Sequence, residues 1–262
     1  MSIGWIETAT GAFRYELDGA GDGPVLVLLH EMGGSLHSFD AVMPVLRATR
    51  RVLRFDARGF GFSVKLTGPL AMADWVADLD ALLDALGISG PCDIAGSALN
   101  GATALAFAAA HPDRVRKVLA MSPVTEVRED RRAWIADFAD RMQANGMAPL
   151  TDNNDTSYPP QTRTDGAAFA AFRARWLCND PRSFAETYRM LSALDMTADF
   201  ARITCPVMLI GAVHDVLRPP ELVRALVDKL PDAQYREVAS GHFLPIQTPE
   251  LFVDLVAECL AP

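Results

Sequence analysis

The chain has 262 residues and a formal net charge of −9, and half of its residues are apolar. This length fits one domain, or one domain with an insertion. The longest unbroken apolar stretch, Ala104 to Ala110, is far shorter than the ~20 residues that a membrane-spanning helix needs. The acidic total, without a run rich in lysine and arginine, argues against a nucleic-acid or membrane partner.

Cysteine spacing and the first residues bear on the compartment. The cysteines Cys92, Cys178, Cys205 and Cys259 are scattered and form no C-x-x-C pair. We therefore expect reduced thiols, with neither a disulfide framework nor a metal site. The first residues contain no basic cluster followed by an apolar core, as a secretory signal would. The sequence thus predicts a cytoplasmic protein.

Short apolar runs alternate with helical patterns, which is typical of βαβ units and a mostly parallel sheet. The run at 24–29 is apolar throughout, as expected of a central strand covered on both faces. Helices are expected at 70–86, which stops at Gly87, and at 102–110. The expected strands are residues 3–8, 12–17, 24–29, 51–55, 92–95, 115–120, 207–210 and 234–238.

Residues 123–200 break this alternation, because they contain helical stretches without a convincing buried strand. We interpret them as a helical cap inserted into a core domain of residues 1–122 and 201–262. Aromatic residues recur in the insertion at roughly helical steps, which favours an apolar helix face packed on the core over ligand contact. These residues are Trp134, Phe138, Phe169, Phe172 and Trp176.

The segment 94–102, IAGSALNGA, runs from an expected strand into an expected helix. A nucleophile elbow of the pattern G-x-S-x-G occupies such a place, and the sharp turn requires a small residue two positions before its apex. With Ala98 at the apex, Gly96 satisfies this requirement. With Ser97 at the apex, bulky Leu99 stands two positions after it. Sterics therefore favour Ala98, which has no nucleophilic group.

An acid and a histidine follow in the second half of the chain. Asp215 lies in a turn after the expected strand 207–210, and His242 lies 27 residues later. In the family that these segments resemble, the acid orients the histidine, keeps it in the correct tautomer and stabilises its protonated form, and the histidine acts as general base. His214, beside the acid, is interpreted as a loop residue.

Together, these segments resemble the α/β-hydrolase superfamily, in particular small capped bacterial enol-lactone, ester and meta-cleavage-product hydrolases. Two further loops carry the resemblance. Residues 30–35, HEMGGS, resemble the family's His-Gly-x-x-x-Ser turn, and residues 56–63, DARGFGFS, resemble its Asp-x-Arg-Gly-x-Gly-x-Ser loop. The resemblance implies an α/β-hydrolase fold, with helices on both faces of the sheet. It also implies a hydrolase that acts on a small ester, lactone, amide or related carbonyl compound, without a cofactor.

The resemblance also implies roles for residues of this chain. Ala98, Asp215 and His242 stand at the catalytic positions, and the amides of Met32 and Leu99 would form the oxyanion hole. Asp56 and Arg58 are expected to brace loops through an ion pair and backbone hydrogen bonds, without contacting substrate. Further candidate pocket residues are His30, Glu31, Ser97 and Ser122.

Three residues depart from the family pattern: Glu31, Ala98 and Asn100. Three explanations of Ala98 stay open. In the first, Ala98 was engineered in place of the serine of a parent enzyme. In the second, Ala98 is native, and His242 activates water directly or moves a proton in a lyase or isomerase reaction. In the third, the chain is a non-catalytic receptor. We expect Glu31 to be a solvated or ion-paired turn residue, with an added acid or base as the alternative.

Arginines of the insertion offer recognition of a carboxylate-bearing substrate by bidentate pairing. Most of them are expected at the surface, and the sequence selects none individually. They are Arg163, Arg173, Arg175, Arg182 and Arg189.

Overall fold

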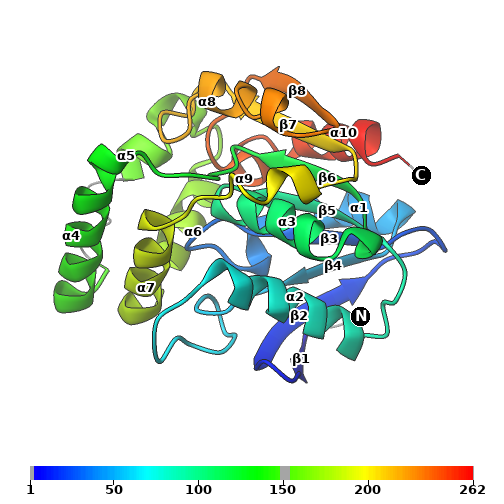
Figure 1. The fold of residues 1–262 in the computed structure, drawn as a ribbon, viewed down its shortest axis with the longest axis horizontal. Helices are drawn as coiled ribbons and strands as arrows, with labels where there is room; N and C mark the ends of the chain where they lie inside the picture. Colours follow the sequence, from blue (N-terminus) through cyan, green and yellow to red (C-terminus); the bar gives the residue numbers. More distant parts are fainter. Residues whose placement is uncertain (1–2, 148–153, 262) are drawn as a thin grey trace.

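The computed structural model describes residues 3–147 and 154–261. Its framework is an eight-stranded sheet in the order β1-β2-β4-β3-β5-β6-β7-β8 (Figure 1). The β1, β2 and β4 pairings are antiparallel, and all pairings from β4 to β8 are parallel. The strands are β1 (Gly4–Glu7), β2 (Ala12–Asp18), β3 (Leu26–Leu29), β4 (Val52–Phe55), β5 (Cys92–Ser97), β6 (Val115–Met121), β7 (Val207–Ala212) and β8 (Ala233–Val238).

The predicted alternation of strands and helices is confirmed, with strand ends shifted by no more than two residues. The helix predicted at 102–110 starts earlier, at Leu99, because the elbow leads directly into it. The helices are α1 (Met43–Thr49), α2 (Met72–Ala85), α3 (Leu99–Ala110), α4 (Glu129–Asn145), α5 (Asn154–Ser157), α6 (Gly166–Leu177), α7 (Pro181–Ser192), α8 (Pro220–Arg224), α9 (Leu244–Gln247) and α10 (Pro249–Cys259). Among the described residues, no helix is long and apolar enough to cross a membrane.

Strand β3 is buried on both faces, as its apolar run predicts. Its residues Val27 and Leu29 belong to the core cluster that includes α2 and α3, whereas Leu26 and Leu28 belong to the cluster that includes α1 and α10. Alternate side chains of a strand point to opposite faces of a sheet. The two apolar layers therefore hold β3 and its neighbour β5 in the middle of the molecule.

The chain between β6 and β7 forms helices α4 to α7, which lie to one side of the sheet (Figure 1). Its two ends are joined by an isolated bridge between Glu126 and Asp195 and by a 3.0 Å hydrogen bond from the Met196 amide to the Thr125 carbonyl. The segment therefore leaves and re-enters the sheet region at one point.

Burial separates the reactivities of the four cysteines, all of which are free in the structure. Removal from water raises the pKa of the Cys92 and Cys205 thiols to about 11 and also raises that of the half-buried Cys259, whereas Cys178 is exposed on the surface. The thiolate is the reactive form of cysteine.

We expect one fast-reacting thiol when the folded protein is treated with a disulfide reagent at pH 8. The fast phase should vanish in Cys178→Ser and persist in Cys92→Ser; its persistence in Cys178→Ser would contradict this assignment.

Candidate active site

The turn between β5 and α3 concentrates backbone strain in one residue. Ala98 has φ 54° and ψ −120°, a conformation that residues with a side chain rarely adopt. Gly96 is required before it, because a Cβ there would lie 2.3 Å from the carbonyl oxygen of Asn100. Ser97 ends β5 and is fully buried, and its hydroxyl has no hydrogen-bond partner in the described part of the chain. The apex of the turn is therefore Ala98.

His242 and Asp215 form a buried pair. Their atoms Nδ1 and Oδ2 are 2.7 Å apart, and the two residues have 7% and 3% of their surface exposed. The other carboxylate oxygen of Asp215 accepts from the amides of Leu217 and Arg218, each at 2.9 Å. With its Nδ1 proton held by the carboxylate, the neutral ring of His242 leaves Nε2 as an acceptor.

The electrostatics of Asp215 favour its charged form. Burial acts to raise the pKa of this carboxyl, but His242, the Ser122 hydroxyl and the Arg218 amide together lower it below its ordinary value. Asp215 is therefore a carboxylate at neutral pH.

The loop after β6 connects the elbow to the acid. The Ala98 amide donates to the Met121 carbonyl at 2.9 Å, and Ser122 is bonded through its amide to Ile210 of β7. The Ser122 hydroxyl helps to lower the pKa of Asp215. Strands β5 to β8 are parallel neighbours, so their carboxyl ends meet at one edge of the sheet. The structure thus brings Ala98, Ser122, Asp215 and His242 to this edge, and Ser122 serves as a partner of the acid.

Two amides beside the elbow have no acceptor. Leu99 is the first residue of α3, where helix geometry leaves the N–H without a partner. Among the described residues, neither Leu99 nor Met32 donates a backbone hydrogen bond. Both amides are therefore available to an oxygen of a bound molecule.

Hydrogen bonds of two side chains, His30 and Asn179, hold the turn at residues 30–35, which contains Met32. His30 is buried, accepts from the Ala57 amide through Nε2 at 3.0 Å, and contacts the Glu31 carbonyl through Nδ1 at 2.7 Å. Above the turn, Asn179 donates to the Gly33 carbonyl at 2.8 Å. The turn is therefore bound to the loop after β4 and to the connection after α6, and His30 is a structural support of the turn.

The expectation for Glu31 was wrong. Glu31 is buried and forms no ion pair in the described part of the chain. Its carboxylate accepts from the Ser38 hydroxyl at 2.9 Å and lies where a Cβ of Gly34 would be, 2.4 Å from Oε1. The missing side chain of Gly34 leaves room for the carboxylate to fold under the turn.

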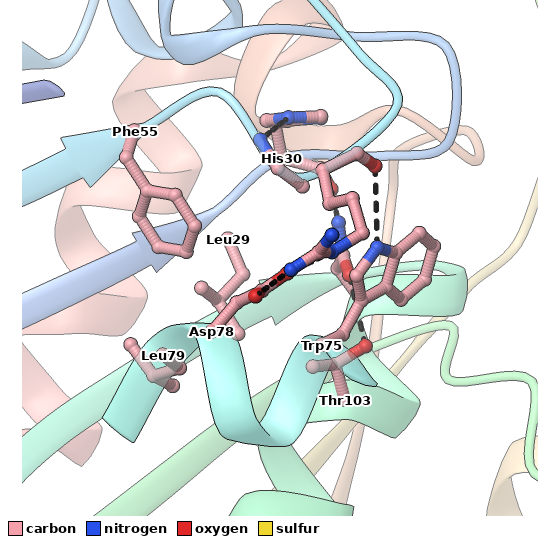
Figure 2. Close-up of a pocket in the computed structure, with 10 residues that line it drawn as sticks. Leu29, His30, Phe55, Trp75, Asp78, Leu79 and Thr103 are labelled. Carbon is pink, nitrogen blue, oxygen red and sulfur yellow. Dashed lines mark hydrogen bonds and ion pairs between the residues drawn. The ribbon is translucent and has the colours of Figure 1, made fainter. Parts of the chain in front are cut away.

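Asn100 links the elbow to the Met32 turn. Its Nδ2 donates to the His30 carbonyl at 2.6 Å, and its Oδ1 accepts from Thr103 at 2.8 Å. A glycine cannot make these bonds, so this departure gives the two turns a direct connection. A cavity of about 10 Å³ lies behind them, with His30, Trp75, Asp78 and Thr103 on its wall (Figure 2). This volume corresponds to about one water molecule, so the cavity is no substrate pocket.

Asp56 and Arg58 brace loops, but not by pairing with each other. Asp56 accepts from the amides of Leu36 and Phe62, both at 2.8 Å, and lies 3.7 Å from Arg14. Arg58 pairs with the buried Asp78 of α2. Both residues hold the β3 and β4 loops in place behind the site.

Comparisons with known proteins agree with this geometry. Residues 24–146 match the family described as alpha/beta hydrolase fold. The match covers a little under half of the chain and agrees with the α/β-hydrolase fold seen in the structure. Pyrrolizixenacetamide deacetylase of Xenorhabdus hominickii is 26% identical over 251 residues, which is 92% of each chain. The 2-hydroxymuconate semialdehyde hydrolase of Pseudomonas sp. strain CF600 is 27% identical over 97% of this chain and 93% of its own.

The solved structures carry the same conclusion. A hydrolase from Pseudomonas aeruginosa PA01 superimposes with a TM-score of 0.91 at 25% identity, over 99% of this chain and 98% of its own. The α/β-hydrolase fold is therefore confirmed, and the relatives identify the chain as an enzyme of the hydrolase class.

Aromatic rings of α6 pack beside the histidine. Phe243 follows His242, and its ring centroid lies 4.6 Å from that of Phe172 and 5.6 Å from that of Trp176. Phe138 and Phe172 are buried, as the expectation of core packing requires, whereas Trp134 is 43% exposed and stacks on Phe138. The buried rings form an apolar wall above the histidine.

The arginines of the insertion differ in their hydrogen-bond partners and in their exposure. Arg189 pairs with Asp140 and Glu186, Arg182 donates to the Thr67 carbonyl, and Arg163 donates to the Tyr158 carbonyl. Arg173 and Arg182 are exposed, and the other three are partly exposed. Arg175 differs because its Nε is enclosed without a partner among the described residues.

Sequence reasoning missed two residues near the site. Asn179 anchors the Met32 turn, and Arg218 is a buried arginine on the loop of Asp215. The sequence signal for Arg218 was its position three residues after the acid.

The amide of Asn100 should stabilise the fold. We expect Asn100→Asp to lower the free energy of unfolding by about 1–3 kcal/mol, because a buried carbonyl loses its donor and faces a carboxylate. Denaturant unfolding at pH 7 measures this. Asn145→Asp at the exposed end of α4, where the amide also binds a carbonyl, is the matched control. Equal effects in the two variants would contradict the proposed role.

The lowered pKa of Asp215 links stability to pH. The folded state holds the proton more weakly than the unfolded state, so Asp215 contributes stability above its unfolded pKa of about 3.9 that is lost as pH falls through the folded pKa. We expect the unfolding free energies of the wild type and Asp215→Asn to differ most at neutral pH and to converge below pH ~4. Urea unfolding at several pH values tests this, with exposed Asp130→Asn as the control. A difference that stays constant with pH would contradict it.

Proposed function

We propose that this protein hydrolyses a small ester, lactone, amide or related carbonyl compound by direct activation of water. The observation that carries the proposal is the buried His242–Asp215 pair, bonded at 2.7 Å, at the same sheet edge as an elbow whose apex is Ala98. A methyl group cannot attack a carbonyl, so an acyl-enzyme at this position is excluded. The histidine is then the group available to activate a nucleophile.

In the proposed reaction, the substrate carbonyl oxygen accepts from the free amides of Met32 and Leu99. Fixed donors placed where negative charge develops stabilise the transition state. The oxygen of a water molecule bonds to the carbonyl carbon, and its proton passes to Nε2 of His242. When the bond to the leaving group breaks, this proton passes to the leaving group. Asp215 holds the ring orientation and balances the charge of the imidazolium.

We propose that residues 123–200 act as a cap over the core domain of residues 1–122 and 201–262. Support comes from α6 and from the connection after it, which reach the site through the Phe172–Phe243 contact and through Asn179. A substrate between cap and elbow would meet the apolar wall of α6, where the Nε of Arg175 is enclosed without a partner among the described residues. The cytoplasmic location stays a prediction of the sequence.

His242 should control turnover. With a panel of small esters, lactones and amides, we expect His242→Ala to lower kcat/KM by about 10²–10⁴-fold, the usual contribution of a general base. His214→Ala, which removes an exposed histidine next to Asp215, is the control and should retain activity. An unchanged rate in His242→Ala would contradict the mechanism.

The variant Ala98→Ser distinguishes direct water attack from the serine-hydrolase and receptor explanations of Ala98. If only Ala98→Ser turns over substrate, with a burst of acylated protein that His242→Ala abolishes, the site is that of a serine hydrolase and direct water attack is wrong. If neither form turns over any substrate but a small molecule binds tightly, the receptor explanation replaces the proposal.

A further inference from the structure

Arg218, in the loop between β7 and α8, is a buried arginine whose charged group has no partner. Only 6% of its surface is exposed, and its Nε is fully enclosed. Within residues 3–147 and 154–261, no side chain forms a hydrogen bond or ion pair with its guanidinium. Arg54 is buried to the same degree but binds both Glu16 and Asp40. The isolation of Arg218 is therefore not the rule for a buried arginine in this protein.

The two carboxylates near Arg218 form their hydrogen bonds or ion pairs with other residues and not with its guanidinium. Its backbone amide donates to Asp215, but the Asp215 carboxylate is bonded to His242. Burial lowers the pKa of Arg218, and the nearby charges of Glu126 and Asp215 partly oppose this. Glu126 has its own partner, Lys229, at 3.3 Å. An arginine stays protonated at neutral pH in such surroundings, so a buried positive charge remains beside the acid loop.

A second unsatisfied donor comes from the neighbouring loop. The Thr125 hydroxyl is enclosed and has no partner among the described residues. Thr125 lies three residues after Ser122, whose amide donates to the Ile210 carbonyl of β7 at 2.9 Å. The Thr125 carbonyl accepts from the Met196 amide at 3.0 Å. Arg218 stands three residues after Asp215, and its charge interacts with Glu126, the residue that follows Thr125. The two unsatisfied donors thus belong to the loops that converge on Asp215.

Burying a cation or a hydroxyl without a partner destabilises a protein, and an anion that binds there relieves the cost. A carboxylate matches the planar donors of a guanidinium and accepts from a hydroxyl at the same time. We propose that Arg218, with Thr125 as a second donor, recognises a carboxylate group of the substrate next to the His242–Asp215 pair. The position of the reacting carbonyl rests on the proposed function, but binding of the carboxylate requires no turnover.

Binding of small probes to the wild-type chain tests the inference directly. Acetate, propionate and benzoate are compared with acetamide, propionamide and benzamide, by calorimetry and by the shift in melting temperature. We expect at least one carboxylate to bind at least tenfold more tightly than its amide. Sodium chloride and sodium phosphate distinguish a carboxylate site from one that takes any anion.

Variants then locate the site. Arg218→Gln should weaken carboxylate binding at least tenfold without lowering the melting temperature of the ligand-free protein, because it removes an uncompensated charge. Arg218→Lys keeps the charge but loses the planar donors, and it should bind with intermediate strength. Arg224→Gln, which changes an exposed arginine of α8, is the matched control and should bind like the wild type.

Four results would overturn the inference. In the binding assays, these are amides that bind as tightly as carboxylates, and stabilisation by chloride or phosphate equal to that by carboxylates. Among the variants, they are an Arg218→Gln protein that melts lower than the control without ligand, and loss of binding in Arg175→Gln but not in Arg218→Gln. Failure of the proposed function is separate, because inactivity of every form leaves a carboxylate site at Arg218 measurable. Conversely, turnover that depends on His242 without carboxylate binding would reject only the Arg218 site.

Discussion

The tight turn at Ala98 is the constraint on which the site depends. A residue with a side chain holds positive φ only when its surroundings enforce it, and here β5 on one side and α3 on the other leave the chain no alternative path. The absence of a side chain at Gly96 allows α3 to start directly after the strand. The same turn leaves the Leu99 amide without an acceptor and presents the Ala98 methyl group at the sheet edge where Asp215 and His242 meet.

Other parts of the molecule hold this turn relative to the remaining loops. Asn100 connects it to the carbonyl of His30, and His30 in turn binds the loop after β4. On the other side, the Ala98 amide donates to Met121, and the next residue, Ser122, donates to Ile210 of the strand that leads to Asp215. The positions of the two free amides and of the imidazole are therefore coupled through short, buried hydrogen bonds rather than set by each loop alone.

The fold could be predicted from the sequence because its information is local. Apolar runs marked the strands, and the steric demand at Gly96 fixed the register of the elbow without knowledge of the rest of the chain. Glu31 and Arg218 could not be predicted in this way. Whether a polar side chain of a loop is buried depends on what packs over it: for Glu31 the space above Gly34, and for Arg218 the loops around Asp215. The pairing of Arg58 with Asp78 likewise depends on where α2 lies against the β4 loop.

The site combines several features that each destabilise a folded chain. These are a residue with a side chain at positive φ, a buried carboxylate, backbone donors without acceptors and a buried guanidinium without a partner. A scaffold that only kept its shape would gain stability by losing any of them, since each costs free energy when nothing is bound. They share one property, which is that a bound molecule with a carbonyl oxygen and an anionic group would satisfy the free donors at once. Strain and unsatisfied polarity gathered at one sheet edge, in a chain whose core is otherwise well packed, therefore favour a ligand-binding and reactive site over a scaffold that has lost its function.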